Sequence, residues 1–210
     1  GYKPDLIGWR AARRVGIPII SISHGWTGAT WKVRCYESID RCILRRVDAV
    51  AAVSKAQADK VRAAGVPEEK IAVIQNAVAA EAFVEPSAAA RAEMVGWFAQ
   101  PPRWIVAAAG RLSPEKGFEL LIKAAALVVK QVPEAGFVLF GEGPLRTALE
   151  KRAADCGLQS NFVFAGFRND LSRFLPNLDL GVMSSYTEGL PIALLETCAA
   201  GVPTGFAAAA

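Results

Sequence analysis

Short apolar runs alternate with segments of helical periodicity along most of this 210-residue chain, and this alternation constrains the fold more than any other feature. In the first half, apolar runs at residues 17–23, 48–54 and 70–78 are separated by helix-like segments. The same order restarts at residues 104–110 and continues to residue 201. This regular succession of strand, helix and strand predicts an α/β fold with parallel sheets.

Composition narrows the classes of function. The chain is 52% hydrophobic and 21% charged, and no run reaches the roughly 18 apolar residues of a membrane helix. One histidine and four scattered cysteines, without a C-x-x-C spacing, argue against a zinc site and favour reduced thiols in the cytoplasm. The formal net charge of +4, without interleaved aromatic and basic residues, argues against a nucleic-acid partner.

A change of composition predicts two domains. Residues 84–102 are rich in alanine and bounded by prolines, which is typical of a linker. We therefore expect a partial N-terminal domain at residues 1–83, a hinge at 84–102 and a partial C-terminal domain at 103–206. The chain begins without Met or a signal-peptide pattern and closes on "GFAAAA", so we expect a fragment truncated at both ends.

Two helices are predicted with defined faces. The expected core positions of the helix near residues 118–132 are Phe118, Leu121, Ile122, Ala125, Val128, Val129 and Val132. In the helix before residue 48, the apolar positions near helical spacing are Val33, Tyr36, Ile43 and Val47. The cations of this second helix are Lys32, Arg34, Arg41, Arg45 and Arg46. A solvated face is the simpler interpretation of these cations, and contact with an anionic membrane is the alternative.

The first of four unusual loops is "GRLSPEKG" at residues 110–117. It places Arg111 and Lys116 in one short loop ahead of a helix. Two cations beside a helix N-terminus suit a diphosphate, because the backbone amides and the helix dipole add to the charges. An ordinary solvated loop is an equally good interpretation of this segment alone.

The second and third loops carry weaker signals. In "GEGP" at residues 141–144, glycines such as Gly143 let the backbone approach a ligand closely, but they also simply turn a chain. In "AGFRND" at residues 165–170, Phe167 and Arg168 could flank a nucleobase, and a surface turn is the alternative. Neither loop identifies a ligand by itself.

The fourth loop opens the segment "SSYTEGLPIALLETCAAGVP" at residues 184–203. Its carboxylates Glu188 and Glu196 are eight positions apart, or about 12 Å along a helix, which is too far for a glycosidase pair. The amides of Gly189 and Leu190 lie at the intervening helix start, where anionic oxygens bind well. The spacing suits a long ligand such as a nucleotide-sugar, although a lone Glu196 on a helix commonly just faces solvent.

Together these segments resemble the family 4 retaining glycosyltransferases, the "glycosyl transferases group 1" set. The resemblance rests on "GRLSPEKG", "GEGP", "GF" and the E-x(7)-E element, and it covers about residues 103–203. The first half resembles the family more loosely, at "SHG", "DAVAAVS" and "AGVPEEKIAVIQNAV". The resemblance implies a GT-B fold, in which two Rossmann-like parallel-sheet domains bind mainly acceptor and donor, respectively.

The resemblance also implies residue roles. Arg111 and Lys116 would hold the donor diphosphate and stabilise the leaving group, so no metal or other cofactor is expected. Glu188 would contact the donor sugar, and His24 matches a cleft histidine beside it. A lone histidine is more often structural.

Further residues would bind the nucleotide-sugar. Glu196 would bind the ribose hydroxyls, and Gly143 would let the chain pass near the nucleotide. The loop with Phe167 and Arg168 would meet the base, partly through its backbone. The amides of Gly189 and Leu190 would lie near the phosphates.

Three departures from the family pattern predict that both domains are incomplete. A glycine-rich loop would precede Gly1, Gln75-Asn76-Ala77 stands where Pro-Asn-Gly is usual, and "TGFAAAA" follows Pro203 in place of a longer glycine-rich segment. The fragment alone could therefore be inactive.

The sequence predicts a retaining glycosyltransferase of polysaccharide biosynthesis. It would move a sugar from a nucleotide-diphosphate-sugar donor to a glycan or lipid-linked acceptor. We expect a cytoplasmic protein, with peripheral contact at an anionic inner membrane face as an open alternative. Two other functions remain open: a nucleotide-binding module without transferase activity, and a GT-B-type nucleotide-sugar epimerase. Product analysis would separate epimerisation from transfer.

Overall fold

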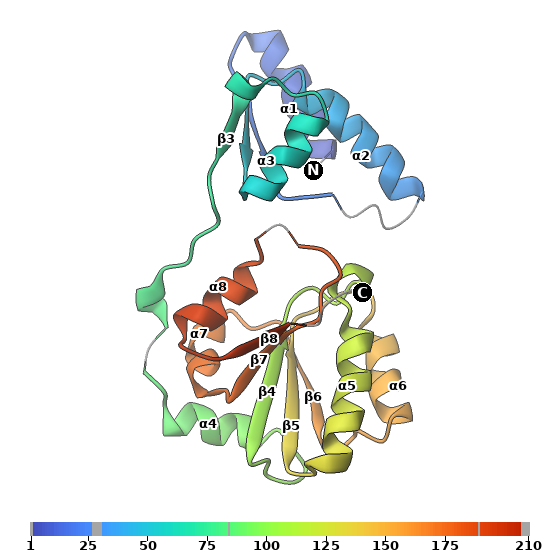
Figure 1. Ribbon diagram of the computed structural model, residues 1–210, viewed down its shortest axis with the longest axis vertical. Helices are drawn as coiled ribbons and strands as arrows, with labels where there is room; N and C mark the ends of the chain where they lie inside the picture. The colour runs from blue at the N-terminus through green and yellow to red at the C-terminus, as the bar shows by residue number, and fades with distance from the viewer. Residues whose placement is uncertain (1, 27–30, 84, 189, 207–210) are drawn as a thin grey trace. The chain divides into compact units, whose positions relative to one another are not determined.

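The computed structural model describes residues 2–26, 31–83, 85–188 and 190–206, and it divides into two compact units. The first unit comprises residues 1–76 and 188–191, and the second comprises residues 77–187 and 192–210. Each unit contains its own parallel sheet with helices around it (Figure 1). The predicted α/β class is therefore confirmed.

The first unit contains three helices and three strands among its described residues. In chain order its elements are α1 (Tyr2–Val15), β1 (Ile20–Ser23), α2 (Trp31–Leu44), β2 (Ala49–Ala52), α3 (Lys55–Ala63), the 3-10 turn η1 (Glu68–Lys70) and β3 (Ile71–Val73). The strands lie in the order β1-β2-β3, and both neighbouring pairs are parallel.

Local sequence explains the ends of two of these helices. Gly16 follows α1 with a φ of +70°, a conformation that favours glycine after a helix. Ser54 caps α3, because its side chain accepts a hydrogen bond of 3.1 Å from the amide of Gln57. The core of this unit packs α2 and α3 against β2 through a cluster of buried residues: Ile43, Leu44, Val47, Val50, Val61 and Val66.

The predicted face of α2 is only partly correct. Ile43 and Val47 are buried as expected, but Tyr36 is exposed. Arg41 was expected on a basic face, whereas its guanidinium lies 4.8 Å from the centre of the Trp26 ring. This cation–π contact places Arg41 against the core, where the helical pattern alone could not predict its partner.

The second unit begins with a short turn and helix and then builds a larger sheet. Its first elements are the 3-10 turn η2 (Ala80–Ala82), α4 (Ala88–Val95), β4 (Trp104–Ala109), the 3-10 turn η3 (Pro114–Lys116), α5 (Phe118–Gln131) and β5 (Ala135–Phe140). They are followed by α6 (Arg146–Asp155), β6 (Phe162–Gly166), α7 (Leu171–Phe174), the 3-10 turn η4 (Leu175–Asn177), β7 (Leu180–Met183), α8 (Ile192–Ala199) and β8 (Thr204–Phe206).

The second sheet is a doubly wound parallel sheet with strand order β6-β5-β4-β7-β8. The chain moves outward from β4 to β6 and then returns to the other side of β4 to form β7. The strand order therefore reverses between β4 and β7. In such sheets ligands bind outside the carboxyl ends of the strands at this reversal.

The strand residues of the second unit alternate between two buried clusters. Val106, Phe137 and Leu139 face the helices α5 and α6. Ile105, Val138 and Phe140 face the opposite side, where α4 and the α7–η4 segment pack. Figure 1 shows α5 and α6 on one side of this sheet and α4 and α7 on the other. Covering both faces of a parallel sheet holds the strand ends in fixed positions.

Two sequence predictions concern the second unit: the core face of α5 and the hinge at residues 84–102. The predicted core positions of α5 from Phe118 to Ala125 are buried, and Val129 and Val132 pack against the same cluster, but Val128 is 40% exposed. The predicted hinge at 84–102 contains α4, which Ser87 caps and which buries Ala90 and Met94 in the second unit. The division between the units falls between residues 76 and 77.

Candidate functional site

A pocket of about 800 Å³ lies at the carboxyl ends of the strands of the second unit. Its lining comes from the ends of β4 and β5, the loop after β6, the start of α7, one side of α8 and the segment before α4. The lining residues are 77–79, 82, 83, 109–111, 140–142, 167–169, 171, 172, 192, 193 and 196. This position matches the ligand crevice of doubly wound sheets.

The loop after β4 places one predicted cation in this pocket and the other nearby. Arg111 is exposed and lines the pocket. Lys116 ends η3 directly before α5, and its Cδ and Cε would lie 3.6 Å from a methyl group added at Gly110, another lining residue. The carbonyl of Lys116 accepts a hydrogen bond of 2.9 Å from the hydroxyl of Ser184, which follows β7. This hydrogen bond holds the loop after β4 against the end of β7, where the strand order of the sheet reverses.

Glycines lock the loops after β4 and β5 together. Gly141 has a φ of +133°, and a Cβ at this position would overlap the carbonyl oxygen of Gly110. A Cβ at Gly143 would lie 2.5 Å from the carbonyl oxygen of Leu112. Gly143 is not among the residues that line the pocket, so its close approach is to protein backbone. Its predicted approach to a nucleotide stays a prediction.

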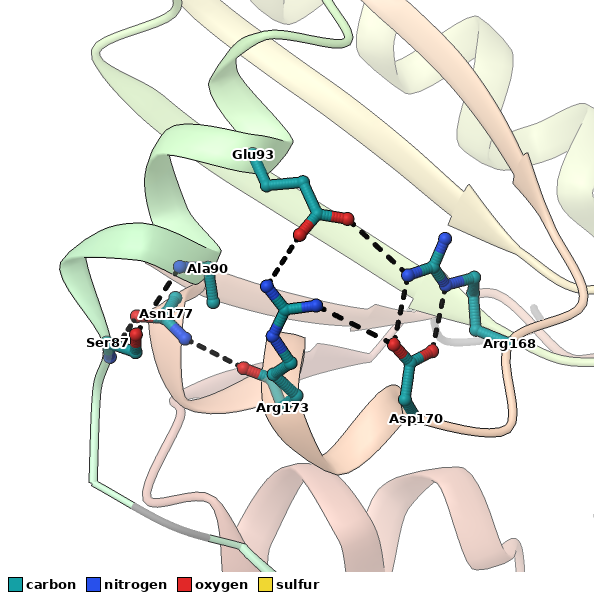
Figure 2. A network of polar contacts seen from close by, with 7 residues as sticks. All are labelled: Ser87, Ala90, Glu93, Arg168, Asp170, Arg173 and Asn177. Atoms are coloured by element: carbon teal, nitrogen blue, oxygen red, sulfur yellow. Dashed lines mark hydrogen bonds and ion pairs between the residues drawn. The ribbon is translucent and has the colours of Figure 1, made fainter.

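The loop after β6 brings both of its predicted residues to the pocket, in different states. Phe167 lines the pocket and is 75% exposed, so its ring is available to a ligand. Arg168 also lines the pocket, but Asp170 accepts hydrogen bonds of 2.9 and 3.0 Å from its guanidinium. Glu93 lies 3.5 Å from the same guanidinium (Figure 2). Asp170 and Glu93 raise the pKa of Arg168, and Arg168 in turn lowers the pKa of Asp170.

Glu196 lies on α8 and faces the pocket. Its side chain is half-buried, and burial raises the pKa of its carboxyl group. A partly desolvated carboxylate is a strong acceptor for hydroxyl groups of a ligand. The helix was expected to start near Gly189 and Leu190, and it is observed to start at Ile192.

The second carboxylate and its neighbours belong to the other unit. Glu188 is exposed and is grouped with the first unit, so its distance from Glu196 stays a prediction. Leu190 is half-buried, and its carbonyl accepts a hydrogen bond of 2.7 Å from the side-chain amide of Asn76 in that unit. Gly189 lies outside the described residues. His24 directly follows β1 in the first unit and is exposed.

The pocket combines groups suited to an anionic and hydroxylated ligand. Arg111 supplies a positive charge at the end of β4, and Glu196 supplies a hydrogen-bond acceptor on α8. Phe167 and Phe83 add aromatic surface to the lining. No group of three or more His, Cys, Asp or Glu side chains is placed to hold a metal ion within the described ranges.

Comparison with known families decides the classification. The model of the family described as "Glycosyl transferases group 1" matches residues 91–204, which is more than half of the chain. The chain belongs to this family. A model described as "Glycosyl transferase 4-like domain" matches residues 1–77 of the same group 1 chain.

Two curated relatives of this group 1 chain differ in the donor and acceptor that their names give. A GDP-mannose-dependent alpha-(1-6)-phosphatidylinositol monomannoside mannosyltransferase of Mycobacterium tuberculosis is 32% identical over 178 residues, covering 79% of this chain and 46% of the relative. A UDP-Gal:alpha-D-GlcNAc-diphosphoundecaprenol alpha-1,3-galactosyltransferase of Escherichia coli is 26% identical over 212 residues, covering 96% of this chain and 54% of the relative. The chain spans about half the length of the curated relatives it matches.

A solved structure supports the fold of this group 1 chain. HepE of Anabaena in complex with UDP-glucose aligns with a TM-score of 0.85 at 22% identity, covering 98% of this chain and 57% of that one. At this identity the likeness shows the fold alone. The predicted GT-B type, with two Rossmann-like parallel sheets, is confirmed.

Several lining residues of this group 1 chain were not found from the sequence. Glu142 and Asn169 each follow a strand end, so their position after a predicted strand was the available signal. Ala77, Val78, Ala79 and Ala82, before α4, gave no such signal, because their contact with the pocket depends on how the chain enters the second unit.

Within the described segments, no helix has the length and apolar character needed to cross a bilayer.

Proposed function

We propose that this protein is a retaining glycosyltransferase that moves a sugar from a nucleoside-diphosphate sugar to a glycan or lipid-linked acceptor. The observation that carries the proposal is the pocket at the carboxyl edge of the second sheet, whose lining includes Arg111 and Glu196. Membership of the group 1 family supports it. The relatives named above use GDP-mannose or UDP-Gal, and both act on lipid-linked acceptors.

In this proposal the loop after β4 meets the diphosphate. Transfer breaks the bond between the anomeric carbon and the diphosphate, and the electron pair stays on the leaving oxygen. Arg111, Lys116 and the N-terminus of α5 would stabilise that growing negative charge. The hydrogen bond from Ser184 to the Lys116 carbonyl holds the backbone of this loop before the reaction, which would reduce the reorganisation needed in the transition state. The same two cations would take the part of a divalent ion, so we propose that neither metal nor cofactor is required.

The remaining predicted residues would bind other parts of the donor. Glu196 would accept hydrogen bonds from the ribose hydroxyls, and Phe167 would contact the base. Glu188, the amides of Gly189 and Leu190, and His24 would serve the transferred sugar and the phosphates. The charge of Arg168 is already met by carboxylates, so its contribution would be to shape the loop.

The test uses the intact protein with a panel of UDP-, GDP- and ADP-sugars. Replacing Lys116 or Glu188 with Ala should reduce transfer by about 10²–10³-fold, as removal of one group that stabilises a transition state does. The matched control is Lys123→Ala, which removes an exposed lysine from α5 outside the pocket lining. A chelator should leave the wild-type rate unchanged.

Different outcomes separate the alternatives. Transfer at a near wild-type rate in the Lys116 or Glu188 variants rules out their assigned roles. Nucleotide binding without turnover in the wild type would instead support a binding module. Release of an epimerised nucleotide-sugar as the product would point to an epimerase.

One observation supports peripheral contact with an anionic membrane from the cytoplasmic side, which we propose as a second property. The helix α2 exposes Trp31, Tyr36 and Ile39, and its exposed cations include Lys32 and Arg34. Aromatic and cationic side chains on one helix suit the interface of an anionic bilayer. This position would bring lipid-linked acceptors to the enzyme.

Vesicle sedimentation tests this contact. The double variant Trp31→Ser, Lys32→Gln should lose binding to vesicles of anionic lipid at low salt. The matched control, Leu127→Ser, Lys123→Gln, alters an exposed leucine and lysine of α5 and should sediment like the wild type. Equal recovery of the wild type in the supernatant at low and high salt would dismiss membrane contact.

A further inference from the structure

A network of charged side chains ties the loop after β6 to the helix α4. The carboxylate of Glu93 on α4 accepts a hydrogen bond of 2.6 Å from Arg173 and lies 3.5 Å from Arg168. Asp170 joins the same two arginines from the loop side, at 2.9 Å from Arg168 and 3.9 Å from Arg173. Figure 2 shows Glu93 and Asp170 bridging both guanidinium groups.

Glu93 is held rigidly although it lies outside the pocket lining. Its helix buries Ala90 and Met94 completely against the second core cluster. The helix start is fixed by Ser87, whose amide donates a hydrogen bond of 2.7 Å to the side chain of Asn177. Asn177 in turn donates a hydrogen bond of 3.0 Å to the carbonyl of Arg173 (Figure 2). The carboxylate of Glu93 thus projects from a fixed frame.

The network attaches this loop to the rest of the second unit through side chains. Residues 167–170 belong to neither strand nor helix, so backbone ladders do not hold them. The guanidinium of Arg168 also lies 4.6 Å from the centre of the Phe174 ring and 5.8 Å from that of Trp97. Single exposed ion pairs contribute little, but a partly buried network with aromatic contacts fixes geometry better.

The strand order indicates which part of a donor this loop would meet. The loop after β4 carries Arg111, and β6 lies two strands away from β4 in the sheet. Neighbouring strands are about 4.8 Å apart, so the two loops start about 10 Å apart. A diphosphate at the β4 loop would therefore place the nucleobase, rather than the phosphates, beside Phe167 and Asn169.

We propose that Glu93 is a positioning residue for the nucleobase: by holding Arg168 and Arg173, it fixes the loop wall formed by Phe167 and Asn169. This inference rests on the proposed function, because it assumes that the pocket binds a nucleoside diphosphate. Glu93 itself touches no part of the ligand. Its loss would allow the wall to move while the diphosphate site stays in place.

The experiment compares ligands with and without a base. Dissociation constants are measured by calorimetry for UDP, GDP and ADP, and for inorganic pyrophosphate by competition with the nucleotide that binds. Glu93→Gln should weaken the binding of that nucleotide about tenfold, which is the size of coupling expected between residues of one charged network. Pyrophosphate affinity should change by less than about twofold, because the β4 loop does not depend on Glu93.

A matched control and three outcomes make the test decisive. Asp155→Asn breaks the Lys151–Asp155 ion pair on α6 of the same unit and should change neither affinity. Equal nucleotide affinity in Glu93→Gln and wild type overturns the positioning role. An equal loss for nucleotide and pyrophosphate also overturns it, because it would mean general loosening of the unit. If the wild type binds none of the three nucleotides, the proposed function fails first.

Discussion

The two units contain sheets of the same parallel type but bury them differently. In the second unit every residue of β5 is buried, and a separate cluster of side chains covers each face of the sheet. In the first unit β1 alternates between buried and exposed residues, with Ile20 68% and Ile22 55% exposed. Among the residues that the structure describes, the first unit thus leaves apolar strand surface uncovered, whereas parallel sheets are usually covered on both faces.

The loops of the two units differ in the same direction. In the second unit glycines bring backbone against backbone, as Gly141 does with Gly110 and Gly117 does with Ser184. In the first unit the three atoms nearest to a Cβ added at Gly65 belong to the Arg45 guanidinium, and one added at Gly16 has no atom of the described residues within 4 Å. Interlocked loops keep a binding site in place before the ligand arrives. The second unit is therefore the rigid frame of the candidate site.

The largest expected effect comes from emptying the core of the second unit. Phe140 is 2% exposed, and its ring centre lies 6.2 Å from those of Trp97 and of Phe174. Phe140→Ala should lower the free energy of unfolding of this unit by about 3–5 kcal/mol, through lost contacts and a cavity. Denaturant unfolding followed by hydrogen exchange, resolved by segment, would measure the loss separately for each unit.

The companion variant probes the smaller core. Leu44 is 1% exposed, and Leu44→Ala should lower the unfolding free energy of the first unit by about 2–5 kcal/mol. Each variant should shift the exchange of its own unit and leave the other unchanged. A single shared transition that both variants shift equally would mean that the two units unfold together, and the comparison would not hold.

The sequence predicted the frame of the second unit well because its signals are local. The apolar positions from Phe118 to Ala125 follow helical spacing, and residues directly after strand ends must gather at one edge of a parallel sheet. This is why Arg111, Phe167 and Arg168 were found from the sequence and do line one pocket.

The parts that were missed depend on partners far apart in the chain. Nothing in the sequence around Arg168 indicates that its guanidinium would form an ion pair with Glu93, 75 positions earlier in the chain. Arg41 was predicted to be a solvated cation, but the fold places its guanidinium over the Trp26 ring. The prolines and alanines of residues 84–102 indicated a linker, but the Ser87 cap and the buried faces of Ala90 and Met94 make part of it a packed helix. Tertiary contacts of this kind override local composition.

A pair of glycine substitutions tests the difference between the loops of the two units. Gly117 has a φ of +63°, and a Cβ there would overlap the carbonyl oxygen of Ser184. Gly65 has a φ of +86°, but its nearest neighbour would be Nε of Arg45, at 3.1 Å. Both Gly→Ala changes should cost roughly 1–2 kcal/mol for the left-handed backbone conformation. Gly117→Ala should cost more, because Ser184 or the start of α5 must also move.

Binding measurements separate the two glycines further. If the wild type binds a nucleoside diphosphate as proposed, Gly117→Ala should weaken that binding, since it displaces the loop that holds Arg111 and Lys116. Gly65→Ala should leave that affinity unchanged. Calorimetry and thermal unfolding would check both effects, and equal losses of affinity in the two variants would contradict the interlocked-loop argument.

The smallest expected effects concern two carboxyl groups, one in each unit. Burial raises the pKa of Glu196 in the second unit. Burial also raises the pKa of Asp40 in the first unit; a hydrogen bond of 2.9 Å from Trp26 opposes the rise, and the neighbouring carboxyl of Asp5 adds to it. A raised pKa means that the folded protein binds the proton more tightly than the unfolded chain. The stability from that proton is fully present below the unfolded pKa, near 4, and is lost as the pH rises through the folded pKa.

Amide substitutions should therefore stabilise each unit at neutral pH but not at acid pH. Asp40→Asn keeps an acceptor for Trp26 and can donate to Asp5, so its advantage at pH 7 should vanish near pH 4. Glu196→Gln should show the same pH dependence, yet it should also weaken nucleotide binding, because Glu196 lines the pocket and Asp40 does not. Thermal unfolding across pH, paired with calorimetry, measures both properties. A stability gain that grows as the pH falls would contradict the sign. An unchanged nucleotide affinity in Glu196→Gln would indicate that this carboxylate is buried for packing, and the contrast between a structural acid in one unit and a binding acid in the other would disappear.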